Sequence, residues 1–529
     1  MMHKKLLLIL TFLTVSTTYS SDTDKLHNDT INLITTLGST TAVATAGYLG
    51  YQYMTTPIHP IVNVEQLAET ILNFPTDFAW GVSTASSQNE EDSLNNSWTN
   101  SYLTSKNRSD LSSPGKACAS WTQWQDDIDK ADYLGLNGYR LSIEWSRVQP
   151  TADKFNEAAI AHYVEICKQL QKKGIAPMIC LHHYSDPIWF LEQGGFAKEE
   201  NILKFSNFCQ KMYEALRPFV TQWIVISQPA AYALKGYSQG MQPPFIKDSK
   251  LAELVMLNMF KAHIQVYDII HNSYNQTHIG LEPSIGICHQ ISQMEAYNFY
   301  NPLEHVVANF ADRLYNKSLL RFFKTGHFRT LTPLMNIAYI PQAPEKFDFF
   351  ALSYYSPKSF NWITPVTPRA QKSHQSADLA RIIDKQGMYD AISQAANLGK
   401  PVYVVESGIN PVDETQRILL LNSYLSAISQ AIAHGYDVRG YYNWTLMDNY
   451  EWGMPKDATH FGLYKNRVIN AESTLNQKFK KHHPIFNELA DLDPDFKNHE
   501  YMLKDGGKYY KNIIARQKIN HDKRNEKAI

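Results

Sequence analysis

The stretch VISQPAAY, residues 225–232, marks the end of a buried strand. An apolar run leads into Ser227 and Gln228, and Pro229 then stops the strand pattern because proline has no N–H to donate. Polar residues directly after a buried strand are where α/β barrels carry their functional side chains. Gln228 is unexpected there, because an amide neither gives nor takes a proton at neutral pH.

Eight β-rich runs of this kind alternate with helical stretches. They are FAWGVSTAS (78–86), YRLSIEW (139–145), APMICLHHY (176–184), QWIVISQ (222–228), SIGICHQ (284–290), FDFFALSYY (347–355), PVYVVES (401–407) and VRGYYNWTL (438–446). This alternation indicates parallel strands, and eight is the number that closes a (β/α)8 barrel. A doubly wound open sheet is the alternative, but WGVSTASSQ lacks the Gly-rich phosphate turn typical of it. We therefore predict an α/β fold, a (β/α)8 TIM barrel forming one domain over residues 70–490.

The composition, 44% hydrophobic and 19% charged, is that of a globular protein. A formal net charge of −1 argues against nucleic acid as a partner. The five cysteines are odd in number and show no CxxC spacing, and the chain has no HExxH motif. We predict neither a metal site nor a cofactor. The sequence does not indicate the oligomeric state.

The two ends of the chain differ from this core. Residues 1–20 combine Lys4 and Lys5 with an apolar run and small residues, as in a signal peptide, which predicts an exported protein, whether periplasmic, secreted or membrane-associated. Within the linker 21–69, residues 31–54 carry no charge, which leaves two interpretations open: a membrane anchor, or a linker or helix outside the fold. Residues 491–529 are predicted to be a polar, basic and solvated tail.

The predicted barrel gathers the polar strand ends at one edge. These residues are Gln88, Arg140, His183, Tyr184, Ser227, Gln228, Gln290, Tyr355, Glu406, Trp444, Glu451 and Trp452. Carboxylates and amides suit sugar hydroxyls, and flat aromatic rings suit the C–H faces of sugars. A phosphate or nucleotide site would need more Lys, Arg and Gly. A carbohydrate ligand is therefore the predicted partner.

These residues stand in motifs that resemble family 1 of the glycoside hydrolases, the β-glucosidase type. The matching motifs are FPTDFAWGVSTASSQNE, LGLNGYRLSIEWSRVQP, HHYSDP, GYSQGMQPP, VVESG and WTLMDNYEW, in order over most of residues 74–465. The resemblance implies a retaining mechanism with two carboxylates about 5–5.5 Å apart.

The resemblance also implies roles for individual residues. Glu406 takes the position of the nucleophile, with Arg140 and Tyr355 keeping it ionised. Gln228 stands where the family has its general acid/base glutamate. The implied substrate-binding residues are Gln88, His183, Tyr184, Ser227, Trp444, Glu451 and Trp452.

The chain departs from the family pattern near this amide. Ser227 and Ser353 stand where the family has asparagines, and Val405 and Ser407 flank the nucleophile in place of Thr and Asn. Plant myrosinases, a branch of the family, are similar in having Gln at the acid/base position and cleave thioglucosides, but they keep the preceding Asn. The expected function is a retaining β-glycosidase that is impaired or restricted to good leaving groups.

Two other functions stay open on these residues. One is a catalytically inactive carbohydrate-binding or interaction protein, similar to the klotho-type extracellular proteins. The other is a transglycosylase, since a missing base favours acceptors other than water. Glu144 is the nearest candidate for a replacement acid, although a structural pairing with Arg147 is the simpler interpretation, and Glu90 also matches a structural Glu of the family.

Overall fold

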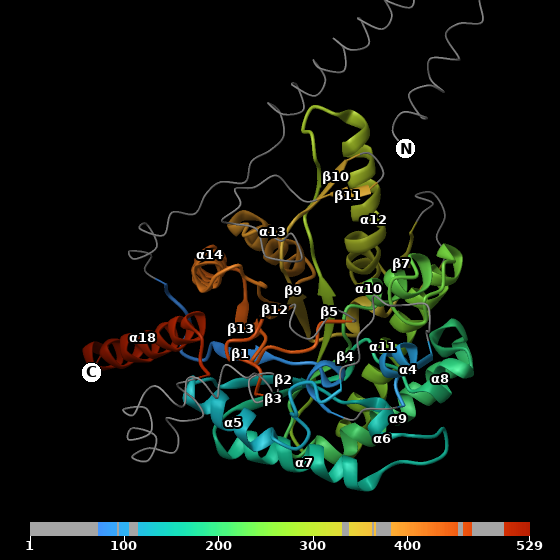
Figure 1. Cartoon of the computed structure of the whole chain (residues 1–529), viewed down its shortest axis with the longest axis horizontal. Coiled ribbons are helices and arrows are strands. Elements are labelled where there is room, and N and C mark those ends of the chain that lie inside the picture. The colour runs from blue at the N-terminus through green and yellow to red at the C-terminus, as the bar shows by residue number, and fades with distance from the viewer. Residues whose placement is uncertain are drawn as a thin grey trace, which may run out of the picture. The chain divides into compact units, whose positions relative to one another are not determined.

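The computed structural model describes residues 72–91, 95–104, 115–330, 338–361, 364–366, 382–452, 459–467 and 502–528. Eight parallel strands close into a barrel in the order β1-β13-β12-β9-β5-β4-β3-β2 (Figure 1). They are β1 (Ala79–Ser83), β2 (Gly138–Ser142), β3 (Ala176–His182), β4 (Gln222–Ile226), β5 (Ser284–Gln290), β9 (Phe349–Ser353), β12 (Val402–Ser407) and β13 (Val438–Trp444). Seven lie within the expected runs, and β2 begins one residue before its run (139–145), so the predicted barrel is confirmed.

The barrel interior is a packed core. It is filled by Met178, Cys180, Ile224, Cys288, Phe349, Ala351, Val405 and Tyr442. Tyr442 lies against Gly81 and Phe349 lies against Gly286, and a Cβ atom at either glycine would overlap the facing ring. Glycine at these two positions thus admits two large rings into a barrel of eight strands.

Helices connect the strands on the outside of the barrel. The long ones are α5 (Trp124–Tyr133), α7 (Glu157–Lys172), α9 (Ile202–Leu216), α11 (Ser249–Thr277), α12 (Pro302–Thr325), α13 (Lys385–Ala396) and α14 (Glu414–Ala433). Side chains of Asn156, Asp248 and Asp413 cap the first turns of α7, α11 and α14 by accepting hydrogen bonds from backbone N–H groups. Gly174 and Gly435 follow α7 and α14 with positive φ, as expected for helix C-termini.

Shorter elements fill the loops between the strands and the long helices. The short helices are α3 (Ser86–Asn89), α4 (Ser97–Thr104), α6 (Trp145–Val148), α8 (Ile188–Glu192) and α10 (Pro229–Ala233). A small sheet joins β6 (Met294–Ala296), β10 (Lys358–Asn361) and β11 (Thr364–Val366), and β7 (His327–Phe328) pairs with β8 (Ala338–Tyr339). Pro229 opens α10, so the strand ends where the sequence indicates.

The C-terminal segment differs from the expected solvated tail. Residues Asp505–Ala528 form a helix, α18, and its Tyr510, Ile513 and Ile514 are buried. The Tyr510 hydroxyl donates to the carbonyl of Gly81 in β1 (3.1 Å). The tail prediction is therefore wrong for this part of the chain, because a narrow apolar stripe is enough to pack a helix that is polar overall.

The predictions for the N-terminal segments 1–20 and 31–54 lie outside the described residues. Among the helices of the described ranges, none has the length and hydropathy needed to cross a bilayer. All five cysteines lie in described parts of the chain, and all five are buried free thiols.

Candidate active site

Glu406 is the centre of a buried polar cluster at the C-terminal edge of the barrel. It lies near the end of β12 and is 3% exposed. Arg140 reaches across from β2 and places Nη1 2.5 Å from Oε1 of Glu406. The Tyr355 hydroxyl, two residues beyond β9, donates to Oε2 at 3.2 Å. Glu406 thus receives a contact from a cation on Oε1 and a hydrogen bond from a hydroxyl donor on Oε2.

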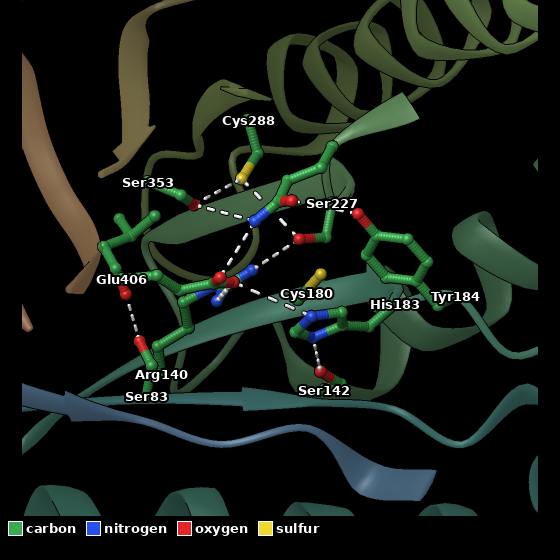
Figure 2. Close-up of polar contacts among 12 residues, drawn as sticks. Ser83, Arg140, Ser142, Cys180, His183, Tyr184, Ser227, Cys288, Ser353 and Glu406 are labelled. Carbon is green, nitrogen blue, oxygen red and sulfur yellow. Dashed lines mark hydrogen bonds and ion pairs between the residues drawn. The ribbon is translucent and has the colours of Figure 1, made fainter. Parts of the chain in front are cut away.

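Gln228 contacts this carboxylate directly, and Figure 2 labels its partners Glu406, Tyr184 and Ser353. Its Nε2 donates to Oε2 of Glu406 at 2.9 Å and to the hydroxyl oxygen of Ser353 at 3.1 Å. Its Oε1 accepts a hydrogen bond from the Tyr184 hydroxyl at 2.9 Å. Because a tyrosine hydroxyl beside a carbonyl must donate, this bond determines which end of the amide faces Glu406. Both amide hydrogens and the amide oxygen therefore have partners.

The backbone at both of these residues is left-handed. Tyr184 has a φ of 64° and Gln228 a φ of 48°. Such conformations are uncommon for residues with side chains, and they cost about 1–3 kcal/mol each where the surroundings enforce them. They occur just beyond the ends of β3 and β4, where the chain turns into the next helices. Burial, followed by the nearby Tyr315, raises the pKa of Tyr184 well above its usual value, so its hydroxyl stays protonated and available as a donor.

Ser227 and Arg140 form a second link in the cluster. Arg140 Nη2 donates to the Ser227 hydroxyl at 3.0 Å, and Cys288 Sγ lies 3.7 Å from the same oxygen. Burial works against the charge of Arg140, but Glu406, Cys180 and Cys288 together more than offset it and raise the pKa of Arg140 above its usual value. Arg140 is therefore a permanent cation shared between Glu406 and Ser227.

His183 lies on the other side of Glu406. Its Nε2 is 3.7 Å from Oε1 of Glu406, and its Nδ1 is 2.8 Å from the Ser142 hydroxyl. Burial and then the Arg140 charge lower the pKa of His183 well below its usual value. The imidazole is therefore neutral at ordinary pH and has no labile extra proton to give.

A second group of predicted residues forms one wall of the site, which consists of the Gln88 amide, the Glu451 carboxylate and the rings of Trp444 and Trp452. Gln88 Nε2 donates to Oε2 of Glu451 at 3.2 Å and to the Tyr450 carbonyl at 2.7 Å. Gln88 Oε1 is buried and accepts no hydrogen bond within the described residues. The Trp452 ring lies 5.2 Å from that of Tyr184, and the Trp444 ring lies 5.9 Å from that of His183. The two groups thus join through His183 and Tyr184, which brings the predicted site residues together except Gln290. The Gln290 amide instead donates to the Ser292 hydroxyl (3.2 Å) and accepts from the Tyr315 hydroxyl (3.3 Å).

Two further contributors were not predicted. Trp98, in α4, donates from Nε1 to the carbonyl of Tyr184 at 2.9 Å, and its ring lies 4.9 Å from that of Trp452. Ser142 orients His183 as described above. Trp98 lies away from any strand end, so the barrel pattern carries no signal for it, whereas Ser142 ends β2 and could have been included.

The neighbouring carboxylates form a network of their own. Glu144 accepts hydrogen bonds from Ser146 (2.7 Å) and Ser185 (3.0 Å), and Arg147 pairs with Glu90 (3.1 Å). The expected pairing of Arg147 with Glu144 is thus replaced by one with Glu90. Within the described ranges, no three His, Cys, Asp or Glu side chains are grouped so as to hold a metal ion.

Comparison with known proteins places this geometry in context. Residues 71–519 match Glycosyl hydrolase family 1. The curated "Beta-glucosidase A" of Acetivibrio thermocellus is 25% identical, covering 84% of this chain and 98% of the relative. The structure of a "beta-glycosidase from Pyrococcus horikoshii" is 32% identical with a TM-score of 0.68, covering 76% and 92%.

The "Family 1 b-glucosidase from Thermotoga maritima" has a similar fold. Its TM-score is 0.71 at 22% identity, with 85% of this chain and 99% of that structure covered. The family match spans most of the chain, and the fold agrees with it. The chain therefore belongs to glycosyl hydrolase family 1.

Proposed function

We propose that the site binds a β-glycoside with its anomeric carbon facing Glu406, and that it cleaves only glycosides whose leaving group is a good one. In this proposal Glu406 is the nucleophile, and Gln228 stands in the place of the general acid/base. The observation that carries the proposal is the hydrogen bond from Gln228 Nε2 to Glu406 Oε2 at 2.9 Å. This contact supports the proposal because it puts the amide directly beside the proposed nucleophile, while the chemistry of an amide provides no proton to transfer.

The first chemical step needs no acid when the leaving group is stable as an anion. Glu406 attacks the anomeric carbon, the bond to the aglycone breaks, and its electron pair leaves as an aryloxide or thiolate. An unactivated alkoxide would have to leave without a proton, at a loss of about 10²–10⁴ in rate. The second step also lacks a base, so water must release its proton directly to solvent and the glycosyl-enzyme accumulates.

The wall formed by Gln88, Glu451, Trp444 and Trp452 supports a glucoside or galactoside as the substrate. The Oε1 of Gln88, which accepts no hydrogen bond from the described residues, is a buried acceptor suited to a sugar hydroxyl, and Glu451 supplies a carboxylate beside it. The aromatic rings of Trp444 and Trp452 suit the C–H face of the sugar. Relatives named "Beta-glucosidase A" and "Beta-galactosidase" agree with this substrate class.

A non-catalytic carbohydrate-binding protein is the second candidate. It is favoured because the polar atoms of the cluster already have protein partners. The amide of Gln228 hydrogen-bonds to protein groups through both its nitrogen and its oxygen, and the Ser227 hydroxyl accepts from Arg140. Ser227 is also shorter than the asparagine of the family pattern, which weakens contact with the 2-hydroxyl where several kcal/mol of transition-state binding arise.

A series of leaving groups tests the proposal. The rates of 2,4-dinitrophenyl, 4-nitrophenyl and methyl β-D-glucosides are measured on the full chain and on Glu406→Gln. The proposal predicts turnover that falls steeply from the first substrate to the third and is lost in Glu406→Gln. Equal rates for the dinitrophenyl and methyl glucosides would mean that another group supplies the proton. Binding of glucose without cleavage of any substrate would favour the second candidate.

A further inference from the structure

We propose that the protein has a second carbohydrate-binding site, a groove on the outer wall of the barrel that takes a neutral oligosaccharide. The groove lies between α11 and residues 338–342, which include β8, and its volume is about 530 Å³. That lies within the range of about 300–1,000 Å³ found for ligand sites. The inference rests on this groove alone and does not depend on the chemistry at Gln228.

The groove is remote from the cluster around Glu406. Its Asp268 pairs with Lys346, which precedes the start of β9, whereas Ser353 ends β9 beside Gln228. The groove therefore lies toward the N-terminal ends of the strands, and the candidate active site lies at their C-terminal ends. One glycan residue cannot occupy both.

An aromatic ring provides a platform in this groove. Tyr339 is 57% exposed, which is unusual for a large aromatic side chain. One face of its ring stacks on the imidazole of His327, with centroids 4.3 Å apart and planes at 21°. The stack fixes the ring before any ligand arrives, so less side-chain freedom is lost on binding. A flat and preorganised ring of this kind suits the C–H face of a sugar.

Polar side chains that line the groove suit sugar hydroxyls. Gln265, Asn272 and Gln342 line the groove, and within the described residues their amide groups make no hydrogen bonds to the protein. Each amide offers both donors and an acceptor, as a hydroxyl does. A row of hydroxyls along an oligosaccharide can therefore pair with all three.

The charges of the groove argue for a neutral ligand. The Lys261 ammonium pairs with Glu199 at 2.8 Å, and the Asp268 carboxylate pairs with Lys346 at 2.6 Å. Both charges that line the groove are thus balanced by partners. A phosphorylated or nucleic-acid ligand would need an excess of positive charge here. An uncharged glycan meets the amides and the ring without that requirement.

The test uses the full chain with two probes, cellotetraose and maltotetraose, which present extended and curved glucans. Affinity is measured by calorimetry, and the bound region is located by hydrogen exchange. We expect one of the two to slow exchange in residues 261–272 and 338–342. Tyr339→Ala should weaken this binding about tenfold, as expected for losing an aromatic contact in a site.

The matched control is Tyr300→Ala, because Tyr300 is a similarly exposed tyrosine (61%) outside the groove. It should leave the affinity unchanged, and protection near Glu406 should be the same in all three proteins. The inference is overturned if neither tetrasaccharide protects the groove segments, or if Tyr339→Ala binds as tightly as Tyr300→Ala. Loss of all cleavage at Glu406 would leave these outcomes intact, so the two proposals fail separately.

Discussion

The amide nitrogen of Gln228 lies 2.9 Å from Oε2 of Glu406, so the two side chains are directly hydrogen-bonded across the top of the barrel. Retaining sites place two carboxyl groups about 5–5.5 Å apart, with the anomeric carbon between them. No substrate atom fits between two atoms in hydrogen-bond contact. A bound glycoside must therefore displace this contact before Glu406 can attack.

Gln228→Glu alone should restore little activity toward methyl β-D-glucoside. The new carboxyl group would face Glu406, and the like charge would raise its pKa, as a general acid requires. Ser227 would still contact the 2-hydroxyl poorly, so we expect less than a tenfold gain. Gln228→Glu combined with Ser227→Asn should gain at least about a hundredfold, toward the usual value of acid catalysis. Full recovery by the single variant would show that Ser227 is not limiting.

Tyr184→Phe should destabilise the protein by about 1–3 kcal/mol, because it leaves the buried Oε1 of Gln228 without its donor. Thermal or denaturant unfolding measures this change. In a Gln228→Ala background the same substitution should have a much smaller effect, since the acceptor is gone. Equal losses in both backgrounds would mean that Tyr184 stabilises only through its ring contacts.

The pH–rate profile for 2,4-dinitrophenyl β-D-glucoside should lack a falling alkaline limb. That limb normally reports the general acid, and Gln228 does not titrate. His183 cannot replace it, because burial and Arg140 hold the pKa of His183 well below its usual range. Rates measured from about pH 5 to pH 9 in buffers of constant ionic strength check this prediction. A normal bell shape would reveal a replacement acid.

Stability should fall as the pH rises from about 4.5 to 7 because of Glu90. Burial raises the pKa of Glu90 from 4.5 to about 7, against the opposing effect of Arg147. In that window the folded protein holds a proton that the unfolded chain has released, so the free energy of unfolding decreases with pH. Glu90→Gln cannot titrate and should flatten the slope. Its amide oxygen can accept from Arg147 while its amide nitrogen faces the oxygen of the Tyr163 hydroxyl. Unfolding midpoints of both proteins between pH 4.5 and 8 make the comparison, and parallel curves would contradict it.

Much of the fold and the membership of the site followed from the sequence. The eight strands are readable because each is a short apolar run, and barrel closure then places Arg140 beside Glu406 although 266 residues separate them. The helix α18 was missed because its polar composition outweighed the spacing of Tyr510, Ile513 and Ile514, which itself fits one helix face.

The contacts of Gln228 lay beyond sequence reasoning. They depend on left-handed backbones at Tyr184 and Gln228 and on the side-chain rotamers of both. Neither residue type requires positive φ, so no residue signals these conformations. The pairing of Arg147 with Glu90 rather than Glu144 likewise depends on side-chain geometry between elements far apart in the chain.

The most direct test of the central claim is the intact mass of the protein during reaction with 2,4-dinitrophenyl β-D-glucoside. If Glu406 attacks and Gln228 cannot activate water, one hexosyl group should accumulate on the peptide containing Glu406, with a stoichiometric burst of dinitrophenol. Azide, which needs no base, should remove the adduct as glucosyl azide, and Glu406→Gln should form none. Absence of both burst and adduct in a protein that still binds glucose would contradict a nucleophilic Glu406 and leave a carbohydrate-binding protein.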